Sequence, residues 1–123
     1  MAVILIVEDD RDSCEILARY IQRAGHIAHC AHNGREAVHL LSEKDPQLVL
    51  LDVSMPEMDG VSFLQVIRSY LRWAQLPVLL ITATTDEAML RRAADLGVKR
   101  VFRKADFNLQ DVSAAINEEL GGA

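Results

Sequence analysis

The segment LVLLDVSMPEMDG, residues 48–60, places four apolar residues directly before Asp52 and a stretch that contains Pro and Gly after it. The start of the chain repeats the first half of this arrangement, because the apolar run 3–7 is followed by the acids Glu8-Asp9-Asp10. Continuous apolar runs of this length are typical of strands that are covered on both faces, as in a parallel sheet. We therefore expect two buried strands, each with carboxylates just beyond its end.

Short apolar runs alternate with helical periodicity along the rest of the chain. The expected strands are 3–7, 27–31, 48–51, 78–81 and 100–103. The expected helices run from residue 10 or 11 to 24, and over 34–43, 60–73, 84–97 and 106–120. Five strand–helix units in succession predict a right-handed, doubly wound α/β domain with a parallel sheet.

Capping residues and apolar spacing mark the ends and the inner faces of these helices. Asn33, Asp59 and Asp106 are expected N-caps, and Thr84 with Glu87 forms a capping-box pattern. The apolar residues expected to face the core are Leu17, Tyr20, Ile21, Ala24, Val61, Leu64, Ile67, Leu71, Leu109, Val112, Ile116 and Leu120.

The composition is that of a single globular domain. Half of the 123 residues are hydrophobic, and a chain of this length has no room for two ordinary cores. We assign residues 1–120 to this domain and 121–123 to a tail or the start of a linker. The net charge of −5 argues against nucleic-acid binding, because contacts to phosphates need clustered Lys and Arg.

Neither a signal peptide nor a membrane span is expected. Glu8-Asp9-Asp10 interrupts the first apolar run, and no run approaches the roughly 20 apolar residues of a membrane-spanning helix. We therefore expect a cytoplasmic protein. Cys14 and Cys30 fit no metal-finger spacing and are expected to be small buried thiols. The histidines at 26, 29, 32 and 39 are not expected to converge on a metal, since a spacing of three in a strand sends neighbours to opposite faces.

Polar side chains follow four of the predicted strands. Glu8 and Asp9 follow the first strand, Asp52 the third, Thr82 the fourth and Lys104 the fifth. In a doubly wound fold the carboxyl ends of the strands form one rim where ligands bind, so we expect these residues to meet there. Taken singly, each acid could equally be a helix cap or a first-turn residue, but their joint placement favours a site.

The residue types at this rim favour phosphoryl transfer. Crowded carboxylates repel one another unless a cation joins them, and hard oxygen ligands suit Mg²⁺. A metal between Asp9 and Asp52 could bridge to a phosphoryl oxygen, while Lys104 and Thr82 hold the other oxygens. Asp52 would be the nucleophile, because an aspartate can form an acyl phosphate, and the protein would supply positioning and electrostatic stabilisation.

The same residues resemble the response regulator receiver domain family over essentially the whole chain. The stretch ILIVEDD, residues 4–10, is similar to the first strand and acidic pair of that family. The stretch LLDVSMPEMDG, residues 50–60, is similar to its phosphoacceptor strand and following loop, and ITA, residues 81–83, to its hydroxyl switch. Lys104 stands 52 residues beyond Asp52, where the family has its lysine.

The resemblance implies both a fold and a mechanism. The implied fold is a flavodoxin-like, five-stranded parallel sheet in the order 2-1-3-4-5, flanked by five helices. Asp52 would accept a phosphoryl group from a phosphohistidine of a sensor histidine kinase or a histidine phosphotransfer protein. The implied site residues are Glu8, Asp9 and Asp52 with the backbone carbonyl of Ser54 as Mg²⁺ ligands, Thr82 as hydroxyl switch and Lys104 as phosphoryl contact. The chain would then be a signalling domain, with at most slow self-phosphorylation and self-dephosphorylation, and not an enzyme.

Two positions depart from the family pattern. Val101 stands where the family often has an aromatic residue coupled to the hydroxyl switch, and Ala105 stands where a proline usually follows the lysine. Without that proline a cis peptide bond would cost about 2.5–4 kcal/mol. We therefore predict a trans Lys104–Ala105 bond, with Lys104 still directed at Asp52.

The stretch from Arg91 to Arg103 has an excess of basic residues, opposed only by Asp95. It is either a solvated face or a docking face for an acidic partner. Because no DNA-binding segment follows, we expect a stand-alone regulator or a phosphorelay intermediate, with no direct contact to nucleic acid or membrane.

Two rival functions stay open on the sequence alone. A degenerate receiver would act as a phosphorylation-independent binding module. A phosphatase of the haloacid dehalogenase type also uses a strand-end aspartate and Mg²⁺, but that class has a second aspartate two residues after the nucleophile, where Ser54 stands here. Incubation with Mg²⁺ and a phosphate compound would distinguish the three functions. A phosphoacceptor would take up one phosphoryl group, a degenerate receiver would take up none, and a phosphatase would turn over a phosphate ester.

Overall fold

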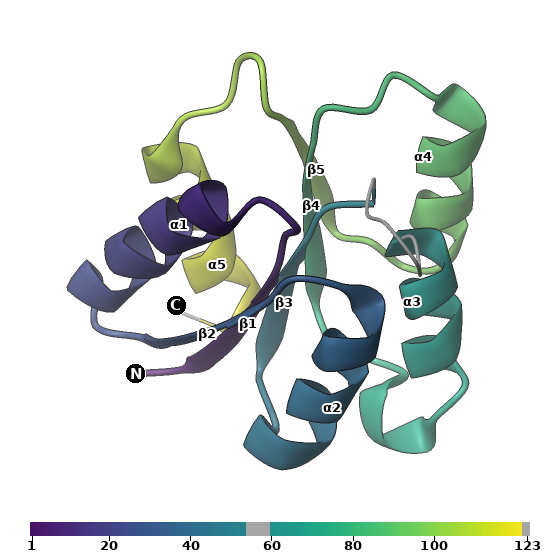
Figure 1. Ribbon diagram of the computed structural model, residues 1–123, viewed down its shortest axis with the longest axis horizontal. Coiled ribbons are helices and arrows are strands. Elements are labelled where there is room, and N and C mark those ends of the chain that lie inside the picture. The colour runs from purple at the N-terminus through teal and green to yellow at the C-terminus, as the bar shows by residue number, and fades with distance from the viewer. Residues whose placement is uncertain (54–59, 122–123) are drawn as a thin grey trace.

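The computed structural model describes residues 1–53 and 60–121, which form a parallel sheet with helices on both faces (Figure 1). The strands are β1 (Val3–Val7), β2 (Ile27–Ala31), β3 (Leu48–Leu51), β4 (Val78–Thr82) and β5 (Arg100–Arg103). The helices are α1 (Arg11–Arg23), α2 (Gly34–Lys44), α3 (Gly60–Arg68), α4 (Glu87–Asp95) and α5 (Leu109–Glu119), and a 3₁₀ helix, η1 (Leu71–Trp73), follows α3. The sheet order is β2-β1-β3-β4-β5, so the predicted fold class and strand order are confirmed.

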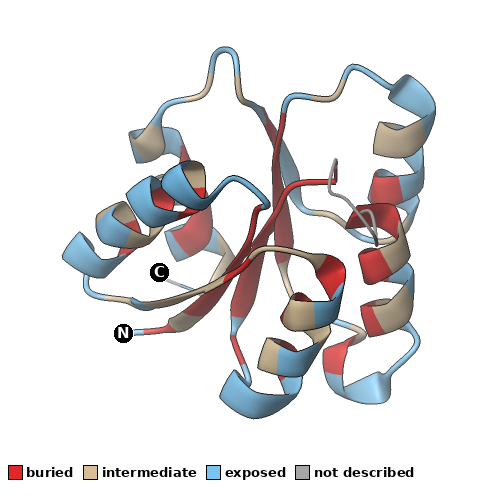
Figure 2. Cartoon of the chain, in the orientation of Figure 1, coloured by how far each residue is buried: buried red, intermediate tan, exposed pale blue. Residues whose placement is uncertain are grey.

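The helices divide into two layers that cover the two faces of the sheet. Helices α1 and α5 lie on one face, and α2, α3 and α4 lie on the other (Figure 1). Alternate residues of each central strand enter different cores: Ile4 and Ile6 pack under α1 and α5, whereas Leu5 and Val7 pack under α2 to α4. The three central strands, β1, β3 and β4, are therefore buried from both sides (Figure 2), which explains why their sequences are continuously apolar.

The topology brings the ends of β1 and β3 together. The two strands pair in parallel with Val7 opposite Leu51, so the residues that follow them leave the sheet side by side. The backbone N–H of Asp52 donates to the carbonyl oxygen of Val7 at 3.0 Å, which extends the pairing by one residue. The chain passes from β1 to β2 on one side and returns to β3 on the other, and this reversal of direction is where doubly wound sheets bind ligands.

The prediction of one helix over 60–73 is wrong at its end. Helix α3 stops at Arg68, and the chain turns before η1. The cause is tertiary, because the Arg68 guanidinium donates to the carbonyl oxygens of Trp73 and Leu76 and so holds the turn in place. Leu71, expected to face the core, is 97% exposed as a result.

Two other helices begin later than predicted. Helix α4 begins at Glu87 with Asp86 as its N-cap, whereas Thr84 accepts a hydrogen bond from the N–H of Asp86 in the preceding turn. Helix α5 is capped by Asn108 and not by Asp106, which lies in a turn after β5. In both segments several cap-forming side chains follow one another, and the residue whose oxygen meets the free N–H groups of the first turn becomes the cap.

The remaining cap and core predictions have mixed outcomes. Asn33 caps α2 as expected, by accepting from the N–H of Glu36. Asp59 lies outside the described residues. Ala24, expected on the inner face of α1, is exposed, because the helix ends one residue earlier and the chain turns at Gly25 with φ of +97°.

The prediction of two free thiols is wrong. Cys14 in α1 and Cys30 in β2 form a disulfide, and their Cα atoms lie 6.3 Å apart, within the range that such a bond spans. A separation of 16 residues in sequence does not reveal this proximity, which arises because α1 packs along β2 on one face of the sheet.

Gly60 allows α3 to start against the strand end that carries Asp52. Its N–H donates to the carbonyl oxygen of Val53 at 2.9 Å. A Cβ atom at this position would overlap the Cα atom of Val53 and crowd the carbonyl oxygen of Asp52, both of them backbone atoms that cannot turn aside.

We expect Gly60→Ala to reduce the free energy of unfolding by about 1–3 kcal/mol, because the added methyl group overpacks a rigid junction. Urea denaturation of the variant and the parent measures this loss. Gly25→Ala is a useful comparison, since a Cβ there meets no atom within 4 Å and only backbone strain is added. Parent-like stability of Gly60→Ala would contradict the close approach.

Candidate functional site

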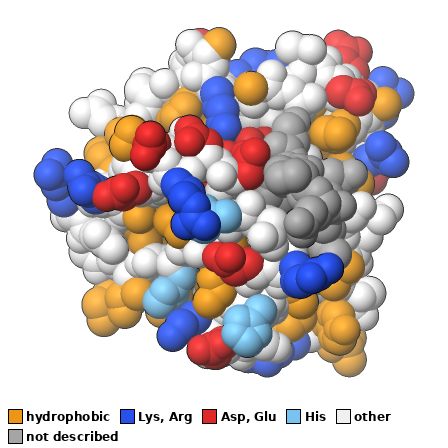
Figure 3. Space-filling model, viewed as in Figure 1, with side chains coloured by type: hydrophobic (Ala, Val, Ile, Leu, Met, Phe, Trp, Pro, Cys, Tyr) orange, Lys and Arg blue, Asp and Glu red, His pale blue; other side chains and the backbone are white. Residues whose placement is uncertain are grey.

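Three carboxylates meet at the carboxyl ends of β1 and β3. Glu8, Asp9 and Asp52 each offer an oxygen, and these oxygens lie within 4.8 Å of one another. Glu8 and Asp52 are almost completely buried, at 3% and 5% exposure, whereas Asp9 is exposed. Figure 3 shows acidic side chains gathered around the start of α1 on this face of the molecule. No other group of three or more His, Cys, Asp or Glu side chains with metal-binding spacing occurs in residues 1–53 and 60–121.

The ammonium group of Lys104 lies between two of these carboxylates. Its Nζ atom is 2.5 Å from Glu8 Oε1 and 3.0 Å from Asp52 Oδ2. The chain contains no cis peptide bond among its described residues, so the Lys104–Ala105 bond is trans. The predicted direction of the Lys104 side chain and the predicted trans bond are therefore both confirmed.

A buried hydroxyl completes the contacts that surround Asp52. Thr82, at 1% exposure, donates through Oγ1 to Asp52 Oδ1 at 3.1 Å. The same Oγ1 accepts from the backbone N–H of Thr84 at 3.1 Å. The two oxygens of Asp52 thus contact groups from β4 and from the end of β5.

Burial and charge compete at this site. Burial raises the pKa of Glu8 to about 7, and the neighbouring acids Asp9 and Asp52 add to this effect while Lys104 opposes it. For Lys104 itself, burial lowers the pKa, but the carboxylates of Glu8 and Asp52 outweigh burial and raise it. One ammonium group does not balance three carboxylates, so the site favours the binding of a further cation.

The donor set fits Mg²⁺. All three side chains offer carboxylate oxygens, which are the hard ligands this ion prefers, and the exposure of Asp9 leaves one side open to water. Ser54, whose backbone carbonyl is the fourth ligand implied by the family resemblance, lies outside the described residues.

Two nearby side chains support the acidic loop without belonging to the carboxylate cluster. A ring nitrogen of His32, Nδ1, lies 3.1 Å from the backbone oxygen of Glu8, a contact that the sequence analysis missed. The position of His32 directly after the second predicted strand was the signal available for it. Asp10 accepts a hydrogen bond from the Ser13 hydroxyl, which lowers the pKa of Asp10 and holds its carboxylate in the first turn of α1.

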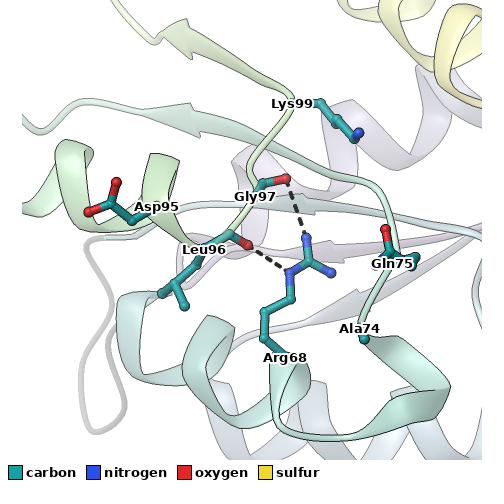
Figure 4. A pocket seen from close by; sticks show the side chains of 7 residues that line it. All are labelled: Arg68, Ala74, Gln75, Asp95, Leu96, Gly97 and Lys99. Carbon is teal, nitrogen blue, oxygen red and sulfur yellow. Dashed lines mark hydrogen bonds between the residues drawn. The ribbon is translucent and has the colours of Figure 1, made fainter.

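A pocket in the described part of the chain lies at the opposite end of the sheet. It has a volume of about 340 Å³, and its lining residues are Arg68, Ala74, Gln75, Asp95, Leu96, Gly97 and Lys99 (Figure 4). Arg68 donates there to the carbonyl oxygens of Leu96 and Gly97, beyond the last turn of α4. The guanidinium of Arg68 thus connects the turn after α3 to the turn after α4. We therefore assign this pocket a role in holding the fold and not in binding a ligand.

Comparison with protein families agrees with the geometry at the acidic rim. A model described as the response regulator receiver domain matches residues 4–117. The chain belongs to the response regulator receiver domain family. Members of this family act in two-component systems and bind Mg²⁺ at an acidic pocket.

This receiver domain is similar to both short and long regulators. It is 32% identical to the probable chemotaxis protein CheY of Rhizobium etli, over 96% of this chain and 92% of that protein. It is 35% identical to the regulatory protein AtoC of Escherichia coli, over 95% of this chain but only 25% of AtoC. Among solved structures, the receiver domain of a signal transduction histidine kinase from Syntrophus aciditrophicus matches with a TM-score of 0.89 and 30% identity, over 100% of this chain and 92% of that one.

In the portion of this receiver domain that the structure describes, no helix is long and apolar enough to cross a membrane.

We expect the metal-free protein to lose stability as the pH rises from about 5 to about 8. The pKa of Glu8 is higher in the folded chain, about 7, than its ordinary value of 4.5, so the folded state binds this proton more tightly. The resulting stabilisation is fully present below pH 4.5 and is lost as the pH passes through 7. Its size is on the order of 1–3 kcal/mol.

Urea denaturation in the presence of a chelator, across this pH range, measures the effect. Glu8→Gln is the control, because its amide resembles the protonated acid at every pH and should make the stability less dependent on pH. Identical pH profiles for the parent and Glu8→Gln would contradict the raised pKa.

Proposed function

We propose that this chain is a phosphoacceptor receiver of a two-component or phosphorelay system, in which Asp52 takes a phosphoryl group from a phosphohistidine. The observation that carries the proposal is the surroundings of the Asp52 carboxylate. It is buried, Lys104 contacts one of its oxygens, Thr82 contacts the other, and Glu8 and Asp9 lie beside it. The donor would be a sensor histidine kinase or a histidine phosphotransfer protein.

The transfer forms a bond between an Asp52 oxygen and phosphorus and breaks the bond between phosphorus and the donor imidazole, which keeps the electron pair. Glu8, Asp9 and Asp52, with the backbone carbonyl of Ser54, would hold Mg²⁺, and the ion would neutralise charge on the phosphoryl oxygens. Lys104 would contribute a fixed positive charge 3.0 Å from the acceptor carboxylate. The side chains of Glu8, Asp52 and Lys104 already lie together before the reaction, so little reorganisation of these three groups is needed during it.

A chain of hydrogen bonds leads from Asp52 to α4. Thr82 contacts Asp52, the N–H of Thr84 donates to Thr82, and the N–H of Asp86 donates to the Thr84 hydroxyl. Asp86 in turn caps α4 by accepting from the N–H of Met89. A phosphoryl group on Asp52 would give Thr82 a new acceptor and could in this way shift the loop that begins α4.

The basic residues of α4 and β5 form our candidate docking surface for an acidic partner. Arg91 and Arg92 in α4, Lys99 before β5, and Arg100 and Arg103 in β5 are all exposed. Because α4 lies at the end of the hydrogen-bond chain, phosphorylation would alter the surface that the partner meets.

We place this signalling in the cytoplasm, where a kinase obtains its phosphoryl group from ATP. The output of any longer protein that contains this domain is a separate matter, since the chain spans about a quarter of AtoC and about half of GltR of Pseudomonas aeruginosa.

Asp52→Asn should abolish phosphorylation, because an amide is a poor nucleophile and a weaker metal ligand. Incubation with Mg²⁺ and a small phosphodonor such as phosphoramidate, followed by intact-mass spectrometry, should add one phosphoryl group to the parent and none to the variant. Circular dichroism checks that the variant is folded. A stable acyl phosphate on Asp52→Asn would overturn the assignment of the acceptor, and a parent that takes up no phosphoryl group would overturn the proposed function.

Thr82→Ala should still take up the phosphoryl group but should not transmit it to α4. Loss of the buried hydrogen bond to Asp52 should also reduce the free energy of unfolding by about 1–3 kcal/mol. The readout is the change in the amide NMR signals of Thr84 and Met89 on phosphorylation, which the variant should lose. Thr82→Ser keeps the hydroxyl and is the matched control. The same signal changes in Thr82→Ala and the parent would exclude Thr82 as the switch.

A further inference from the structure

The Cys14–Cys30 disulfide lies next to the acidic loop, residues 8–10. Cys14 is in the first turn of α1, directly after this loop, and its N–H donates to the carbonyl oxygen of Asp10 at 3.0 Å. Cys30 is near the end of β2, paired with Ile6 of β1. The disulfide therefore joins α1, which follows the acidic loop, to β2, which lies beside β1, the strand that leads into the loop.

A hydrogen bond and the disulfide together close a ring of the chain that includes Glu8 and Asp9. The N–H of Glu8 donates to the carbonyl oxygen of Ala31 at 2.9 Å, one residue beyond Cys30. His32 contacts the backbone oxygen of Glu8 from the same strand end. The backbone of the loop is thus held on the β2 side by hydrogen bonds and on the α1 side by the turn that contains Cys14.

The fold does not require this disulfide for its stability, and the positions of the two cysteines are compatible with both the oxidised and the reduced state. A domain of 123 residues with a core on each face of its sheet is well above the size, about 40 residues, below which a covalent cross-link is usually needed. Cys14 is fully buried, but its Sγ atom lies 3.9 Å from the carbonyl oxygen of Ile6, so a free thiol there has an acceptor. Cys30 is only partly buried, so of the two cysteines it is the one nearer to solvent.

We propose that Cys14 and Cys30 form a reversible thiol–disulfide pair whose oxidised state tightens the Mg²⁺ site at Glu8, Asp9 and Asp52. The inference rests on the proposed function, because it concerns the metal ligands of that site. The disulfide restricts the backbone between its two anchor points, so less conformational entropy is lost when Glu8 and Asp9 bind the ion. The reduced state leaves the loop attached through hydrogen bonds alone.

The redox step is thiol–disulfide exchange with a small-molecule thiol such as glutathione. In reduction, one thiolate attacks the sulfur of Cys30, the less buried cysteine, the Cys14–Cys30 bond breaks, and Cys14 leaves as a thiolate that takes up a proton. A second thiolate then attacks the outer sulfur of the mixed disulfide and releases Cys30. The sum is a protein dithiol and one oxidised glutathione from a protein disulfide and two glutathiones, and oxidation is the reverse.

The first measurement determines the redox equilibrium without any activity assay. The full chain is equilibrated in glutathione buffers of increasing oxidised fraction, the thiols are trapped by alkylation, and the disulfide fraction is read by mass spectrometry. We expect reversible interconversion of two folded states, with faster amide hydrogen exchange at Glu8 and Cys14 in the reduced state. A pair that does not interconvert without denaturant would overturn the proposal.

The second measurement is a Mg²⁺ titration of each redox form by calorimetry. The oxidised form should bind Mg²⁺ at least about five-fold more tightly, the lower range of typical coupling between two sites. Linkage is reciprocal, so saturating Mg²⁺ must shift the redox midpoint by the same factor, when that midpoint is expressed as the squared concentration of glutathione divided by the concentration of oxidised glutathione. Agreement of the two factors distinguishes true coupling from a side effect of the reducing agent.

Variants separate the possible outcomes. Cys30→Ser changes the more exposed partner and Cys14→Ala the buried one; both should bind Mg²⁺ like the reduced parent in every redox buffer. Asp9→Ala should weaken Mg²⁺ binding in both redox forms, which shows that the titration reports this site. Equal Mg²⁺ affinity in the two forms would overturn the redox inference and leave the proposed function intact. Failure of both forms to bind Mg²⁺ would overturn the metal site of the proposed function and the coupling with it.

Discussion

The acidic site depends on one electrostatic constraint: two carboxylates are buried at neighbouring strand ends and must be compensated. Glu8 and Asp52 leave β1 and β3 side by side, in the centre of the sheet. The compensating ammonium comes from Lys104 at the end of β5, two strands away from β3. The side chain of Lys104 has to extend past the end of β4 to reach these carboxylates. The relative register of β3, β4 and β5 therefore contributes to the site.

The sequence predicted the strands and the site for the same physical reason. A strand buried on both faces must be continuously apolar, so each polar residue that ends such a run marks a carboxyl end of the sheet. Asp52 and Lys104 were found in this way, although nothing local to either one indicates a contact across 52 residues. The edge strand β5 has exposed residues, and its sequence signal was correspondingly weaker.

Most of the features that could not be predicted depend on contacts between distant segments. Helix α3 ends early because Arg68 donates to carbonyl oxygens of the following turn and of the segment after α4. The disulfide requires α1 to lie along β2, and the contact from His32 to Glu8 requires β2 to lie beside β1. Helix starts at Asp86 and Asn108 were missed because several neighbouring side chains could each have served as the cap.

The two arginines of β5 also determine how copies of this domain can meet. An edge strand presents unpaired backbone groups that invite pairing with the edge of another sheet. Arg100 and Arg103 stand exposed at the two ends of this short strand, so two such edges brought together would place like charges against each other. Growth of the sheet from molecule to molecule is thereby disfavoured at β5.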